Sequence, residues 1–143
     1  MALNVDHLLR TAATLEQALL ALDKTARGDD VMFDLFRNAA IKSFELSLET
    51  AGKLLRKALK AYGGSPRGVD GLVFNDVLRH AGKHGIFEEA GVERWLAYRS
   101  NRNNTAHDYG ESFANETLTL LPNYLADVRA LATKLQEVFD AAR

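Results

Sequence analysis

Apolar residues recur at every third or fourth position through most of this 143-residue chain. This spacing places them along one side of an α-helix, whereas a half-buried strand would show an apolar residue at every second position. Only two prolines, Pro66 and Pro122, interrupt the pattern, and no alternating stretch competes with it. The sequence therefore predicts an all-α protein.

The first two helices are marked by their ends. A leucine and alanine seam predicts a helix over about residues 4–26, with Gly28 just beyond it as a residue that suits a helix C-terminus. Asp29 and Asp30 are good caps for the helix that follows. Its apolar seam runs from residue 33 to residue 59, which makes it the longest predicted helix.

Glycine and proline separate this long helix from the rest of the chain. The segment GGSPRG, residues 63–68, has the composition of a turn, and we expect a linker inside one domain there. A shorter helix is expected from near Asp70 to Gly85.

The last third of the chain predicts two more helices. One carries Trp95 and ends at Gly110, and the other carries leucines and valines at helical spacing up to Val138. Pro122 lies within the second of these helices and predicts a break or a kink there. Five helices with mostly short connections predict one antiparallel bundle domain over residues 1–143.

Composition excludes several classes of protein. The chain has no cysteine, so disulfides and thiolate metal sites are excluded, and no run is apolar enough to span a bilayer. The N-terminus does not resemble a signal peptide, so we expect a cytoplasmic protein with no membrane association. The net charge of −1 gives no overall attraction to nucleic acid, and any contact with RNA must come from local basic patches.

One polar stretch, RNNTAHDYG at residues 102–110, stands out from this helical background. Arginine is a permanent cation that suits phosphate, and histidine exchanges protons near neutral pH. Arg102 and His107 together suit cleavage of an RNA phosphodiester without a metal, which needs proton transfer and positive charge at the phosphorane. Arg99 and Arg94, one and two turns earlier, are candidate phosphate contacts, although such arginines also occur on solvated helix faces.

Helix geometry sets a condition on this chemistry. On a regular helix of about 100° per residue, the side chains of Arg102 and His107 would point roughly 140° apart. Either the helix unwinds near Asn103 and Asn104, or two copies of the chain meet so that Arg102 of one approaches His107 of the other. A two-fold homodimer would bring this about because it places the same patch of both copies face to face. Asn103, one turn before His107, could orient its ring.

Structural alternatives remain open at this point. Two asparagines near a helix end are common, and a lone histidine is more often a surface or core residue than a catalytic one. His80 and His84 have the spacing of a helical metal pair, but the sequence provides no clear carboxylate partner. We therefore predict no metal site and no cofactor.

The spacing Arg102, four residues, His107, one residue, Tyr109 resembles the signature of HEPN domains. Two further segments, residues 36–59 and 74–89, are similar to the second and third helices of the HEPN branch called nucleotidyltransferase substrate-binding proteins. The resemblance covers about residues 4–140. Gly52 departs from it, because that branch usually has tryptophan there, and Trp95 is a candidate for replacing the lost ring.

The resemblance implies a helical homodimer that works beside a minimal nucleotidyltransferase. It implies a metal-independent ribonuclease toxin with Arg102 and His107 as catalytic residues, Asn103 and Asn104 as supporting residues, and Tyr109 as the residue to which the transferase attaches AMP. The alternative is a non-catalytic subunit that binds a substrate or nucleotide for the transferase, using the same polar patch. The chain itself has no Gly-Ser turn followed by an Asp-x-Asp pair, so the partner would supply the transferase chemistry.

Overall fold

A computed structural model describes the backbone of residues 4–107 and 111–142, and the side chains of residues 4–102 and 114–142. The described residues form six helices. They are α1 (Asp6–Asp23), α2 (Asp30–Ala61), α3 (Pro66–Asp70), α4 (Phe74–Lys83), α5 (Glu89–His107) and α6 (Glu111–Ala141). The prediction of an all-α bundle is confirmed, with one helix more than expected.

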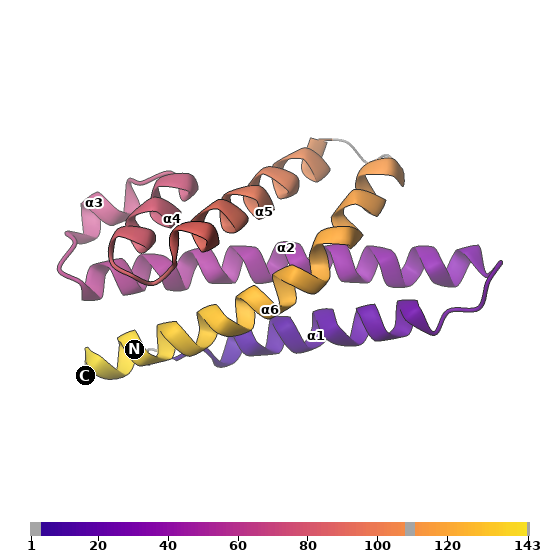
Figure 1. Ribbon diagram of the computed structural model, residues 1–143, viewed down its shortest axis with the longest axis horizontal. Coiled ribbons are helices and arrows are strands. Elements are labelled where there is room, and N and C mark those ends of the chain that lie inside the picture. The colour runs from indigo at the N-terminus through magenta and orange to yellow at the C-terminus, as the bar shows by residue number, and fades with distance from the viewer. Residues whose placement is uncertain (1–3, 108–110, 143) are drawn as a thin grey trace.

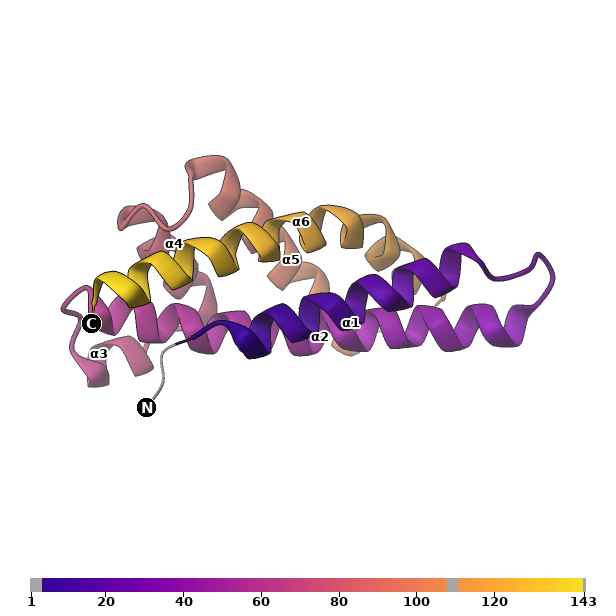
Figure 2. The same ribbon diagram turned by 90° about the horizontal axis from the view of Figure 1, so that it is seen from below.

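Helix α2 is the element on which the others are arranged (Figure 1). Helix α1 lies antiparallel beside it in both views, and α6 packs on α1 and α2 (Figure 2). Helices α3 and α4 contact the C-terminal part of α2, and α5 runs from α4 to α6. None of the helices in the described part of the chain is long and apolar enough to cross a membrane.

The ends of α2 follow the sequence signals. The Asp29 carboxylate accepts a hydrogen bond from the backbone N–H of Met32 at 3.2 Å, as a capping residue does. Gly63 follows the helix with φ of +95°, a conformation that favours glycine. The predicted cap and stop signals of α2 are therefore confirmed. The predicted end of α1 is wrong, because that helix ends at Asp23, five residues before Gly28.

The predicted linker is wrong in one respect, because it contains a helix. The Ser65 side chain accepts a hydrogen bond from the N–H of Gly68 at 3.0 Å, and Pro66 occupies the first helical position, where its missing N–H costs nothing. This pairing of cap and proline starts α3 where turn composition alone suggested irregular chain. The following helix, α4, consequently begins at Phe74 and not near Asp70.

Helix α6 does not break at Pro122. The residue before the proline and the second residue after it, Leu121 and Tyr124, are both fully buried, so packing holds the two halves of the helix in one continuous element. Burial of side chains on both sides offsets the lost backbone hydrogen bond. Figure 1 shows the axis of α6 changing direction along its length.

The core of the bundle is centred on aromatic rings from α2, α5 and α6. Trp95 is 1% exposed and makes edge contacts with Tyr98 and Tyr124, whose ring centroids lie 5.6 and 5.4 Å away. Tyr124 also meets Phe44 edge to face at 4.8 Å. These contacts hold α5 against α6, and α6 against α2, which determines where the polar end of α5 lies.

The Tyr124 hydroxyl donates a buried hydrogen bond of 2.7 Å to the Ser47 hydroxyl. We expect Tyr124→Phe to lower the free energy of unfolding by about 1–2 kcal/mol, because the Ser47 oxygen would lose this partner while shielded from water. Urea denaturation measures the change. Tyr62→Phe removes the same hydroxyl from a 43% exposed ring and should change stability by less than about 0.5 kcal/mol. Equal effects of the two substitutions would contradict this assignment.

Candidate functional site

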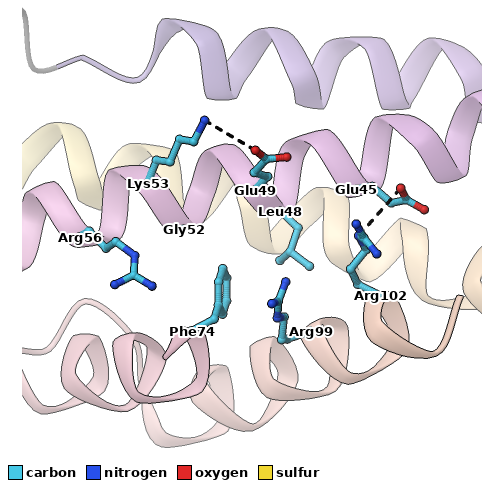
Figure 3. A pocket seen from close by; sticks show the side chains of 9 residues that line it. All are labelled: Glu45, Leu48, Glu49, Gly52, Lys53, Arg56, Phe74, Arg99 and Arg102. Carbon is cyan, nitrogen blue, oxygen red and sulfur yellow. Dashed lines mark ion pairs between the residues drawn. The ribbon is translucent and has the colours of Figure 1, made fainter. Parts of the chain in front are cut away.

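A cleft opens between α2 on one side and α4 and α5 on the other (Figure 3). Its volume is about 360 Å³. The described residues in its lining are four cationic side chains, two carboxylates and a small apolar floor: Glu45, Leu48, Glu49, Gly52, Lys53, Arg56, Phe74, Arg99 and Arg102. Two of the arginines predicted from the sequence, Arg99 and Arg102, therefore meet in one place.

Arg102 lies at one end of this cleft, on the penultimate turn of α5 (Figure 3). Its Nε is 3.9 Å from a carboxylate oxygen of Glu45, and both side chains are partly accessible, at 32% and 22% exposure. This separation lies at the outer limit of an ion pair and beyond hydrogen-bond distance.

Arg99 lies one turn earlier and points into the cleft (Figure 3). Its guanidinium carbon is 4.8 Å from the centre of the Phe74 ring, a cation–π contact. Burial, and then the neighbouring charge of Arg102, lower the pKa of the Arg99 guanidinium. Both causes disfavour the charged form of Arg99, so a nearby anion would stabilise it.

Gly52 determines how closely Phe74 approaches α2. A Cβ atom at position 52 would lie 2.5 Å from Cε2 of the Phe74 ring, which is too close for any side chain. The ring of Phe74 therefore fills the space beside Gly52. Trp95, which we considered as a replacement for the tryptophan usual at position 52, packs instead against Phe87, Tyr98 and Tyr124.

Arg56 completes the inner wall of the cleft from α2. Its two terminal nitrogens donate hydrogen bonds to the carbonyls of Val69 and Leu72, each at 2.8 Å. These bonds hold the chain around α3 and the start of α4 against α2. They satisfy two donors but leave the positive charge of Arg56 without a carboxylate partner among the described residues.

Arg94 does not line this cleft. Its guanidinium donates two hydrogen bonds to the Asp127 carboxylate, at 2.8 and 3.1 Å, and so joins α5 to α6. The Tyr98 hydroxyl donates to the same carboxylate at 2.6 Å. Burial, and then this hydrogen bond, raise the pKa of Tyr98 well above its usual range. A role of Arg94 as a phosphate contact remains a prediction, and its charge is already compensated by Asp127.

The other predicted site residues lie at the edge of what the structure describes. Asn103, Asn104 and His107 belong to the last turns of α5, but their side chains are outside the described part, and Tyr109 is wholly outside it. The backbone of α5 is helical from Glu89 to His107. The helix therefore does not unwind at Asn103 and Asn104, and the meeting of two copies stays a prediction.

Sequence reasoning missed the α2 side of the cleft. Glu45, Glu49, Lys53 and Arg56 follow one another at intervals of three or four residues and so share a helix face next to the apolar seam. This polar stripe was visible in the sequence. What the sequence did not indicate was that Arg56 and Glu45 from this stripe would border a cleft with Arg99 and Arg102 of α5, which lie far along the chain, while Glu49 and Lys53 point to the outer side of α2.

Comparison with known proteins adds a family and a fold. A family model described as nucleotidyltransferase substrate binding protein like matches residues 4–137. A Haemophilus influenzae protein named probable ribonuclease HepT is 25% identical over 138 residues, which span 94% of this chain and 93% of that protein.

Two solved structures share the fold. A Haemophilus influenzae structure, described as revealing the fold of a substrate binding domain of a nucleotidyltransferase, matches with a TM-score of 0.80 and 24% identity, over 93% of this chain and 99% of the other. A crystal structure from Thermus thermophilus matches with a TM-score of 0.70 and 23% identity, over 90% of this chain and 98% of the other.

Proposed function

The chain belongs to the nucleotidyltransferase substrate binding protein-like family, and from this membership we propose that it is the ribonuclease toxin of a pair whose other member is a minimal nucleotidyltransferase. The observation that carries the proposal is the position of Arg102, whose guanidinium lies at an open cleft on an unbroken helix that ends at His107. The similarity to a protein named a probable ribonuclease supports the same reaction.

The proposed reaction is cleavage of an RNA phosphodiester without a metal. His107 takes the proton of a ribose 2′-hydroxyl, and the 2′-oxygen forms a bond to the neighbouring phosphorus. The bond from phosphorus to the 5′-oxygen breaks, and this oxygen receives a proton from the imidazolium, so a 2′,3′-cyclic phosphate and a 5′-hydroxyl remain. Arg102 stabilises the charge of the phosphorane, and Asn103 and Asn104 orient the histidine.

A homodimer is part of the proposal because α5 is regular up to His107. On such a helix Arg102 and His107 of one chain diverge by about 140° and do not reach the same phosphate. In a two-fold dimer each site takes Arg102 from one protomer and His107 from its partner. The protein then has two equivalent sites, each shared between the protomers.

The transferase partner would silence this site by attaching AMP to Tyr109. The tyrosine oxygen forms a bond to the α-phosphorus of ATP, pyrophosphate leaves, and the hydroxyl proton passes to solvent or to a base of the transferase. The new phosphodiester carries a negative charge two residues from His107 and seven from Arg102. The negative charge would pair with Arg102, which otherwise binds RNA, and the AMP group would block access of the substrate.

The experiment combines modification with cleavage. Incubation of the purified protein with the transferase, ATP and Mg²⁺ should add one AMP per chain, detected by mass spectrometry, and should stop degradation of RNA. Tyr109→Phe should gain no AMP and should resist silencing, whereas Tyr62→Phe, which removes a hydroxyl from an exposed ring, should behave as wild type. Modification at another residue would refute the role of Tyr109.

The second candidate function is a non-catalytic subunit that binds a nucleotide for the transferase. The observation that favours it is the cleft itself, whose volume lies near the lower end of the range for small-molecule sites. An unmodified wild-type protein that leaves RNA intact but binds ATP or AMP would support this function over the ribonuclease.

A further inference from the structure

The described residues give the inner part of the cleft more positive charge than their carboxylates can balance. Among the described residues, four cationic and two acidic side chains line it, and the two acidic side chains lie beside the cations at its outer edge. Lys53 and Glu49 form an exposed pair at 3.6 Å that Figure 3 shows on the outer side of α2, and Glu45 is near Arg102. Arg56 and Arg99 point inward without a carboxylate partner among the described residues.

The Arg99 guanidinium lies over the Phe74 ring, with its central carbon 4.8 Å from the ring centre. A guanidinium that lies over an aromatic ring contacts it through its flat face, so its N–H groups, which lie in the plane, can still bind an anion. No described residue accepts a hydrogen bond from Arg99. Gly52 makes this arrangement possible, because it lets the Phe74 ring lie directly against α2 and support the guanidinium.

The position of Arg99 relative to Arg102 indicates which kind of molecule would carry the anion. The two residues are one turn apart on α5 and line the same cleft, and each lowers the cost of bringing a negative group to the other. Successive phosphates of a single RNA strand can therefore be bound by a row of such cations, one phosphate at each. A volume of about 360 Å³ accommodates a phosphate together with its ribose.

We propose that the cleft between α2, α4 and α5 binds a second phosphate of the RNA strand, next to the phosphate at Arg102, with Arg99 as its principal ligand and Arg56 as a supporting charge. This proposal rests on the ribonuclease function. It adds to that function a binding subsite that cleaves nothing and that fixes the position of the strand. The same chemistry, a phosphate that carries a nucleoside, is also found in free AMP, and the test separates the two sources.

The test measures binding of RNA and not its cleavage. The probe is a short, fluorescein-labelled, single-stranded RNA of mixed sequence whose 2′-hydroxyls are all methylated, so that the proposed reaction cannot occur. Its affinity is measured by fluorescence anisotropy over a range of salt concentrations, for the wild type, Arg99→Gln, Arg99→Lys and Arg129→Gln. Arg129 is the matched control, because it is a half-exposed arginine that pairs with Glu16 outside the cleft.

We expect Arg99→Gln to weaken RNA binding about tenfold at low salt. The slope of log affinity against log salt concentration should fall by about 0.7, the value for one lost contact with a single-stranded phosphate. Arg99→Lys should keep the slope and lose part of the affinity, since it keeps the charge but not the planar fork of donors. Arg129→Gln should match the wild type. Circular dichroism of each variant checks that the bundle is intact.

Three outcomes would overturn the proposal. The first is an Arg99→Gln variant with the affinity and salt slope of the wild type, and the second is a wild type that binds no RNA. The third is loss of AMP or inorganic phosphate binding in Arg99→Gln while RNA binding is unchanged, which would make the cleft a mononucleotide site. Because the probe cannot be cleaved, failure of the ribonuclease function, seen as intact ordinary RNA, would leave the binding result readable by itself.

Discussion

We expect His107→Ala to lower the rate of RNA cleavage by about 10²–10⁴-fold, the usual contribution of a residue that transfers protons in the transition state. Alanine cannot take the proton of the 2′-hydroxyl or return it to the 5′-oxygen. The loss should appear in the cleavage rate while RNA still binds, because Arg99 and Arg102 keep their charges. Expression of the variant should likewise no longer arrest growth.

Cleavage of a labelled RNA by purified protein measures this loss, with an excess of EDTA present throughout. The matched control is His7→Ala, which removes an exposed histidine at the start of α1 and should leave the rate unchanged. Two results would contradict the proposed chemistry. They are cleavage that persists in His107→Ala, and wild-type cleavage that stops when EDTA is added.

The helices could be predicted from the sequence where local signals and packing agree. Asp29 caps α2 and Gly63 follows its end because each satisfies a backbone requirement that does not depend on distant residues. Pro122 shows the opposite case. Its local preference predicted a break or a kink, and the buried side chains of Leu121 and Tyr124 keep α6 one continuous helix whose axis changes direction.

The α5 side of the site could be predicted in the same way. Arg99 and Arg102 are three residues apart, so any regular helix presents them on one face. Arg94 is five residues before Arg99 and lies about 140° around the helix from it. The structure accordingly places Arg94 against Asp127 and away from the cleft.

The cleft itself could not be predicted, because it depends on how distant helices pack. The approach of α4 to α2 requires that Gly52 and Phe74, from different helices, leave room for each other. The hydrogen bonds of Arg56 to the carbonyls of Val69 and Leu72 likewise join residues from different parts of the chain. Such contacts follow from the tertiary arrangement, and no spacing rule within one helix encodes them.

The second large effect concerns the sharing of each site between two protomers. A heterodimer of an Arg102→Ala protomer and a His107→Ala protomer contains one site that has lost both groups and one site that keeps both. It should cleave RNA at about half the wild-type rate, although both parent homodimers are nearly inactive. The reverse pairing joins a wild-type protomer to a protomer with both substitutions. Each of its shared sites has lost one group, so it should be nearly inactive.

These two heterodimers, purified through different affinity tags on the two protomers, provide the most direct test of the account. Sites built from Arg102 of one protomer and His107 of its partner predict cleavage by the first heterodimer and almost none by the second. The reverse result, an inactive first heterodimer and a half-active second one, would show that each chain carries a complete site and would contradict the proposed mechanism.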